Sequence, residues 1–71
     1  MPIYVNEMIK INDIVLKRRK FLNLTQAQLA ERAEISLKSL KSIEYGDGNP
    51  TLNNLTKVLD VLGMKLTVEL K

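Results

Sequence analysis

The sequence lacks several residues on which many protein functions depend. Its 71 residues include no cysteine, no histidine and no tryptophan. Without cysteine there is no disulfide framework, and without histidine or cysteine the commonest zinc ligands are missing. The same two absences remove the usual general bases and thiol nucleophiles of enzymes. We therefore expect a protein that is not an enzyme and that uses no metal and no other cofactor.

Long apolar runs are also missing. No stretch approaches the roughly 18 apolar residues that a membrane-spanning helix needs, and no signal-peptide pattern opens the sequence. A chain of this length forms one small domain, which buries only about 60% of the surface of its unfolded state. We expect a single domain over residues 1–71 that is cytoplasmic and does not contact a membrane.

Positive charge is in modest excess but unevenly distributed. The net charge is +3, from 11 basic and 8 acidic residues. Four basic residues are consecutive at positions 17–20, and Lys38 and Lys41 recur in a later segment. Such clusters resemble an electrostatic footprint for phosphate groups. A run of four like charges is equally typical of a solvated helix face, and the sequence leaves both interpretations open.

Apolar residues recur at helical spacing in four segments. They predict helices over about residues 7–22, 25–33, 36–45 and 52–62. Thr25 and Gln28 have the spacing of a capping box, and Ser36 and Thr51 are further N-caps. Gly63 suits the end of the last helix. The sequence therefore predicts a mostly α-helical fold.

Only about three residues separate the second and third helices. Apolar residues form a seam where the two helices meet: Leu29, Ala30, Ala33, Ile35, Leu40 and Ile43. Two short helices that cross over a tight turn are the motif whose second helix enters the major groove of DNA. The spacing therefore predicts a DNA-binding module.

The period of the pattern changes after Gly63. Leu66, Val68 and Leu70 alternate with polar residues, which predicts a strand over about residues 64–70. One strand cannot satisfy its own backbone, so its partner is either residues 3–5 or the same strand of a second copy. We favour the second option, a homodimer in which Leu66, Val68 and Leu70 are the dimerisation residues. Two recognition helices would then reach successive major grooves.

A larger set of residues resembles a known family. The set reads Leu24-Thr25-Gln26, Leu29-Ala30, Ile35-Ser36, Ile43-Glu44-Tyr45-Gly46, Pro50-Thr51 and Leu55. It is similar to the lambda-repressor-like, xenobiotic-response-element (Cro-type) class of helix-turn-helix proteins, over about residues 11–62. The resemblance implies a four-helix domain that binds double-stranded DNA, through the major groove of a pseudo-palindromic operator. The short length and closing strand are also similar to HipB-like antitoxins, which implies a partner toxin kinase.

The family's site residues can be transferred position by position. The resemblance implies that Gln26 binds a DNA phosphate and that the third helix contacts DNA through Ser36, Leu37, Lys38, Ser39, Lys41 and Ser42. Lys38 and Lys41 can donate to guanine or to phosphates alone. Leu37 can contact a thymine methyl or pack back onto Leu40, and Gln26 can be a simple helix-start residue. Arg19 and Glu44 match a buried ion pair between the first and third helices.

The sequence departs from the family at one turn. Glu34 stands where family members commonly have glycine, between the second and third helices. A glutamate with a positive φ costs on the order of 1 kcal/mol, so we expect a reshaped turn. Asn23 replaces another customary glycine, and asparagine tolerates a positive φ.

Taken together, these observations predict a sequence-specific repressor that regulates its own operon as the antitoxin of a toxin–antitoxin pair. Two alternatives are open. One is a repressor of the phage or mobile-element type without a toxin. The other is a helix-turn-helix module that binds only protein.

Overall fold

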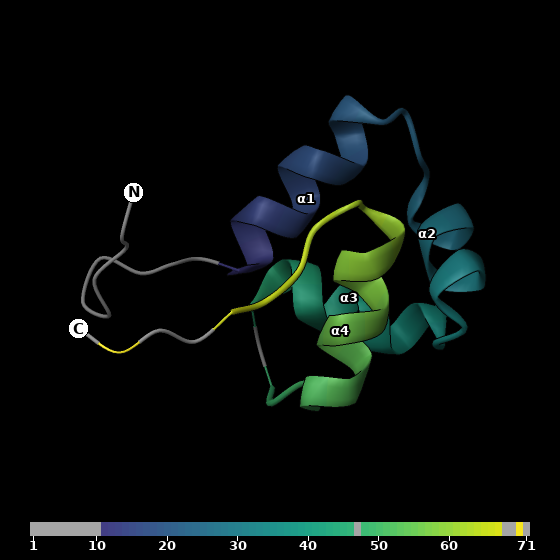
Figure 1. Ribbon diagram of the computed structural model, residues 1–71. Coiled ribbons are helices and arrows are strands. Elements are labelled where there is room, and N and C mark those ends of the chain that lie inside the picture. The colour runs from purple at the N-terminus through teal and green to yellow at the C-terminus, as the bar shows by residue number, and fades with distance from the viewer. Residues whose placement is uncertain (1–10, 47, 68–69, 71) are drawn as a thin grey trace.

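The computed structural model describes residues 11–46, 48–67 and 70, which contain four helices. These are α1 (Ile11–Phe21), α2 (Gln26–Ala33), α3 (Leu37–Tyr45) and α4 (Leu52–Val61). Helix α2 packs against α3 and α4, while α1 packs against α3 (Figure 1). The mostly α, four-helix fold predicted from the sequence is confirmed, and the part of the first helix predicted before residue 11 lies outside the described residues. Within the described residues, no helix combines the length and the apolar character that crossing a bilayer requires.

Side chains from all four helices meet in one core. Five of the six residues predicted for the seam between α2 and α3 are buried there, and Ile35 is half-buried at its rim. Burying one such aliphatic side chain contributes roughly 1.5–3 kcal/mol, so this core fixes the crossing of α2 and α3. The buried apolar residues are Val15, Leu29, Ala30, Ala33, Leu40, Ile43, Val58, Leu59 and Leu62.

Two apolar residues at the ends of the predicted helices 7–22 and 52–62 lie at the surface and not in the core. Leu52 is 65% exposed and Leu22 is 37% exposed. Leu52 belongs to the first turn of α4, and Leu22 follows the last residue of α1. Periodicity alone assigns both to the core, but an apolar residue at a helix end has packing partners on fewer sides.

Hydroxyl side chains fix the start of three helices. Thr25 Oγ1 accepts a hydrogen bond from the backbone N–H of Gln28 (3.0 Å), and Gln28 Oε1 accepts one from the backbone N–H of Thr25 (2.9 Å). Ser36 and Thr51 also accept a backbone N–H, each at 3.0 Å. The predicted capping box and N-caps are confirmed. Each cap fixes the first residue of its helix, because it supplies a partner for an otherwise unpaired backbone donor. The cap at Ser36 therefore lets α3 begin only a few residues after the end of α2.

The turn between α2 and α3 keeps the shape that a glycine would give it. Glu34 has φ 58° and ψ 43°, in the left-handed region. Its N–H donates to the carbonyl of Glu31 (3.1 Å), and the N–H of Ile35 donates to the carbonyl of Ala30 (3.0 Å). The expectation of a reshaped turn is wrong, because this pair of backbone hydrogen bonds holds the left-handed residue in place.

We expect Glu34→Gly to stabilise the protein. Relief of the left-handed strain gains about 1 kcal/mol, and the greater freedom of glycine in the unfolded chain offsets part of it. The melting temperature should rise by about 2–6 °C, measured by circular dichroism. Glu31→Gly is the matched control, because it removes the same charge from an exposed position within α2 and should cost about 1 kcal/mol. Equal melting temperatures for the two variants would contradict the assignment of strain to Glu34.

The strand predicted over about residues 64–70 is absent from the part of this segment that the structure describes. Residues 64–67 have no strand, and positions 68 and 69 lie outside the described residues. A strand needs a neighbouring strand to satisfy its backbone, and residues 3–5, the partner considered within the chain, also lie outside the description. Pairing of this segment across a dimer stays a prediction.

Candidate nucleic-acid interface

The residues of α3 that are predicted to contact DNA and the residues that anchor the helix in the core lie on different sides of the helix. Leu40, Ile43 and Glu44 are buried on its inner side. Leu37, Lys38 and Lys41 are exposed, and Ser39 and Ser42 are half-buried. The core therefore fixes the inner side of α3 and leaves two amino groups on its outer side.

The first turn of α3 uses two of the predicted contact residues internally. Ser36 Oγ accepts the backbone N–H of Ser39 and donates its own proton to Ser39 Oγ at 2.9 Å. These two hydroxyls therefore help to begin the helix. Leu37 is 40% exposed. This exposure favours contact with a thymine methyl over packing back onto Leu40.

A polar groove of about 440 Å³ runs between α3 and the start of α4. Lys38, Ser39 and Ser42 line it from α3. Asn49, Thr51 and Asn54 line it from the loop and α4, and these three are not among the DNA-contact residues that the sequence predicts. Hydroxyl, amide and amino groups are the donors that proteins use for phosphates and base edges. The sequence shows two asparagines on either side of the Thr51 cap, which could have indicated polar contact residues. Their approach to α3 depends on tertiary packing, so the sequence alone does not predict it.

Gln26 begins α2 and contacts the end of α3. Its side chain is half-buried, and Nε2 donates a hydrogen bond to Glu44 Oε1 at 3.1 Å. The predicted phosphate-binding side chain is therefore joined to the helix predicted to enter the major groove.

Arg19 and Glu44 form the ion pair expected from the sequence. Arg19 Nε lies 2.6 Å from Glu44 Oε2, and Arg19 Nη2 lies 3.0 Å from Glu44 Oε1. Arg19 Nη1 also donates to the carbonyl of Leu24 at 2.8 Å. Arg19 is 9% exposed and Glu44 is 5% exposed. The pair therefore joins α1, α3 and the turn before α2 in the protein interior.

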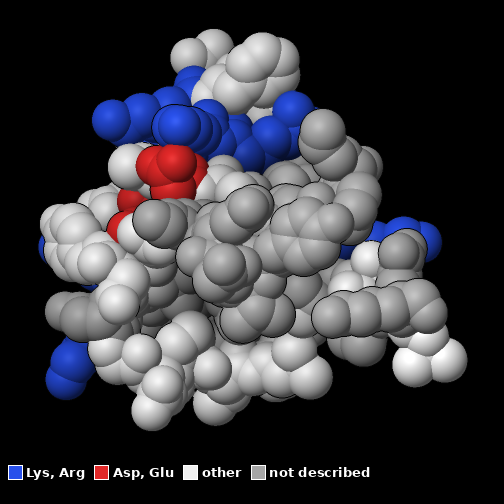
Figure 2. Space-filling model, turned by 90° about the vertical axis from the view of Figure 1, so that its left-hand side faces the viewer, with Lys and Arg blue, Asp and Glu red and all other residues white. Residues whose placement is uncertain are grey.

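The basic run of α1 is largely engaged within the protein. Lys17 pairs with Asp13 at 3.0 Å on the surface, and Arg18 Nε donates to the carbonyl of Leu62 at 3.0 Å. The Arg18 guanidinium also lies 5.3 Å from the centre of the Phe21 ring. Figure 2 shows Lys and Arg side chains in a band across the upper part of one face, with acidic side chains beneath them. Together with Arg19, three of the four basic residues at 17–20 therefore have partners within the fold.

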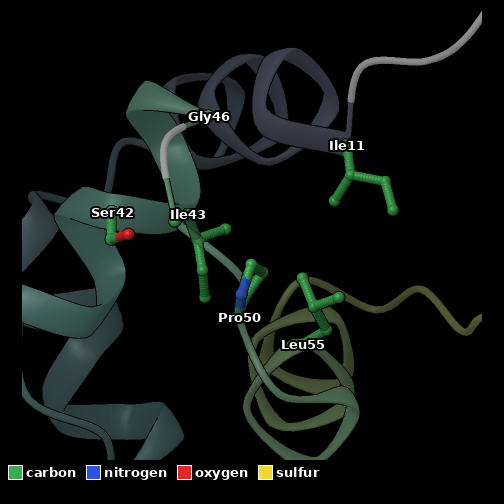
Figure 3. Close-up of a pocket in the computed structure, with 7 residues that line it drawn as sticks. Ile11, Ser42, Ile43, Gly46, Pro50 and Leu55 are labelled. Atoms are coloured by element: carbon green, nitrogen blue, oxygen red, sulfur yellow. The ribbon is translucent and has the colours of Figure 1, made fainter.

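A second, smaller pocket of about 100 Å³ opens beside the start of α1. Figure 3 shows Ile11 on one side of it and Pro50 and Leu55 on the other, with Ile43 and Ser42 from α3. None of the residues that line it is charged. This pocket therefore lacks the cationic groups of a phosphate site, in contrast to the polar groove.

Comparison with known proteins finds a helix-turn-helix family model and two phage repressors. A family model described as helix-turn-helix matches residues 15–68. The chain is 44% identical over 57 residues to the cryptic phage CTXphi transcriptional repressor RstR of Vibrio cholerae serotype O1, covering 80% of this chain and 51% of that protein. It is 43% identical over 49 residues to the immunity repressor protein of Bacillus phage phi105, covering 69% of this chain and 34% of that protein. The chain thus spans about half the length of the first relative and about a third of the second.

Proposed function

The chain belongs to the helix-turn-helix family, and from this premise we propose that it is a sequence-specific, DNA-binding transcriptional repressor. The observation that carries the proposal is helix α3, which has a buried inner side and exposes Lys38 and Lys41 on its outer side. Two relatives that match most of this chain are named as repressors, one of a cryptic phage and one of a phage. Their names support repression as the outcome of DNA binding.

In the proposed complex, α3 lies in the major groove of double-stranded DNA. Lys38 and Lys41 donate to guanine O6 and N7 or to phosphates, and Leu37 contacts a thymine methyl. Ser42 and the groove residues Asn49 and Asn54 extend the contact towards the DNA backbone. Gln26 binds a phosphate at the start of α2, where backbone N–H groups favour an anion. Ser36 and Ser39 hold the first turn of α3 beside the bases.

We propose a homodimer on a pseudo-palindromic operator, with half-sites about one helical turn apart. Leu66, Val68 and Leu70 are the proposed dimerisation residues. Leu66 is 47% exposed and Leu70 is 98% exposed, so both would lose contact with water on association. Val68 lies outside the described residues. The support is the alternation of apolar and polar residues, because a strand formed between two copies would satisfy the backbone of both.

The relatives favour a repressor of the phage type over an antitoxin. Neither of their names refers to a toxin. The antitoxin role, with a toxin kinase as partner, stays a prediction from the sequence. A kinase-like toxin encoded beside this gene and copurifying with this protein would favour it.

The test is binding to DNA from the region upstream of the protein's own gene. We expect preference over a scrambled duplex of equal length, and a footprint with two protected half-sites. A dimer that neutralises about six phosphates should lose on the order of 10³-fold in affinity between 50 and 200 mM salt. Equal binding to both duplexes would reject sequence-specific repression. No binding to either duplex would favour a module that binds only protein.

A further inference from the structure

One buried carboxylate joins two side chains that reach it from different helices. Glu44 Oε2 accepts a hydrogen bond from Arg19 Nε at 2.6 Å. Glu44 Oε1 accepts from Arg19 Nη2 at 3.0 Å and from Gln26 Nε2 at 3.1 Å. Glu44 is 5% exposed, whereas Gln26 is half-buried at the start of α2. The carboxylate therefore lies between an ion pair of the interior and a side chain that reaches the surface.

We propose that Glu44 is a positioning residue for DNA binding, which orients the carboxamide of Gln26 so that its amide nitrogen faces a phosphate. The inference rests on the proposed function and assigns to the ion pair a second role beside the fold. From the sequence, Arg19 and Glu44 are predicted only as a structural ion pair.

The chemistry of the carboxamide makes its orientation matter. Its NH2 and C=O ends have similar shapes, but a phosphate oxygen can accept a hydrogen bond only from the NH2 end. An ionised carboxylate also only accepts, so Glu44 selects the NH2 end and repels the carbonyl end. One N–H of Gln26 Nε2 bonds to Glu44, and the second N–H on the same nitrogen is the donor for the phosphate. A rotated carboxamide would instead present its oxygen to an anion.

The guanidinium of Arg19 makes this arrangement compatible with DNA. A lone carboxylate beside a phosphate would repel it, but Arg19 neutralises Glu44 through two parallel hydrogen bonds. Arg19 is itself fixed by the carbonyl of Leu24, at 2.8 Å. Gln26 is thus held by a group that cannot rotate freely. Less side-chain freedom is then lost when the phosphate binds.

A double-mutant cycle tests the proposal. The first change is Gln26→Ala, and the second replaces the ion pair by apolar residues, Arg19→Met with Glu44→Leu, which leaves no unpaired buried charge. We expect Gln26→Ala to weaken binding to the upstream duplex about tenfold in the wild-type background and less than twofold in the apolar background. Lys41→Ala is the control and should cost the same in both backgrounds, because Lys41 lies on the outer side of α3. A tenfold loss from Gln26→Ala in both backgrounds would overturn the proposal.

A measurement on the wild-type protein gives an answer that needs no apolar variant. In a ¹⁵N-resolved NMR spectrum, the two Nε2 protons of Gln26 should have shifts displaced from those of a solvent-exposed glutamine, and the proton bonded to Glu44 should show nuclear Overhauser contacts to the Glu44 side chain. Shifts equal to those of a solvent-exposed glutamine, with no contacts to Glu44, would overturn the positioning role, even when the protein binds DNA. A wild-type protein with no preference for its upstream DNA would instead reject the proposed function, and with it this inference.

Discussion

Replacing Arg19 with methionine is expected to remove most of the protein's free energy of unfolding at 25 °C. The change leaves Glu44, which is 5% exposed, without its guanidinium partner. Removing one partner of a buried ion pair costs about 3–5 kcal/mol, because the remaining charge is buried and uncompensated. The total stability of small domains starts at about 5 kcal/mol, so little would be left. The midpoint of urea unfolding, followed by circular dichroism, measures the loss.

Two controls separate this effect from a general loss of charge. Lys17→Met removes a cation two positions earlier in α1, from an exposed pair with Asp13, and should cost less than about 0.5 kcal/mol. Combining Arg19→Met with Glu44→Leu should recover most of the stability, because no buried charge is left. A loss below about 1 kcal/mol in the single Arg19 variant would show that water reaches Glu44 and solvates it.

The helices could be predicted from the sequence because local rules determine where they begin and end. Thr25, Ser36 and Thr51 each cap the backbone three residues ahead, and the observed helices begin one residue after each of them. Gly63 has φ 75° and ends the last turn, as glycine does at this position. These features depend on neighbours within one helical turn, so a single sequence contains the information.

The candidate site could be predicted only in part. Exposure of Lys38 and Lys41 follows from the seam on the other side of α3, which periodicity predicts. The approach of Asn49 and Asn54 to α3 depends on how the loop after α3 packs. The hydrogen bond from Gln26 to Glu44 joins residues 18 positions apart, and no local spacing encodes it.

The turn at Glu34 shows a different limit of sequence reasoning. The sequence predicts the strain of a left-handed glutamate. It does not say whether this strain outweighs the hydrogen bonds and packing that the turn makes in the folded domain. Two backbone hydrogen bonds and the packing of Ile35 against the core hold the turn in the strained form. The choice between a strained and a reshaped turn is therefore made by the whole domain, at a cost on the order of 1 kcal/mol.

Replacing both Lys38 and Lys41 with alanine is expected to reduce affinity for the upstream duplex by roughly 100-fold, because a contact to a base or a phosphate is worth about 1–3 kcal/mol. Both side chains are exposed, so the stability should change by less than about 0.5 kcal/mol. Fluorescence anisotropy with the labelled duplex at several salt concentrations measures the effect. Unchanged affinity would refute α3 as the DNA-binding surface.

The salt series also distinguishes the two kinds of contact that the lysines can make. If both bind phosphates, the slope of log affinity against log salt should fall by about one for each lysine lost, and all sequences should weaken alike. If they bind guanines, the preference over the scrambled duplex should shrink as well. Lys57→Ala with Lys65→Ala is the matched control, because it removes two exposed charges outside the groove and should cost less than about threefold. Equal losses in the two double variants would mean that net charge, and not the position of Lys38 and Lys41 on α3, determines binding.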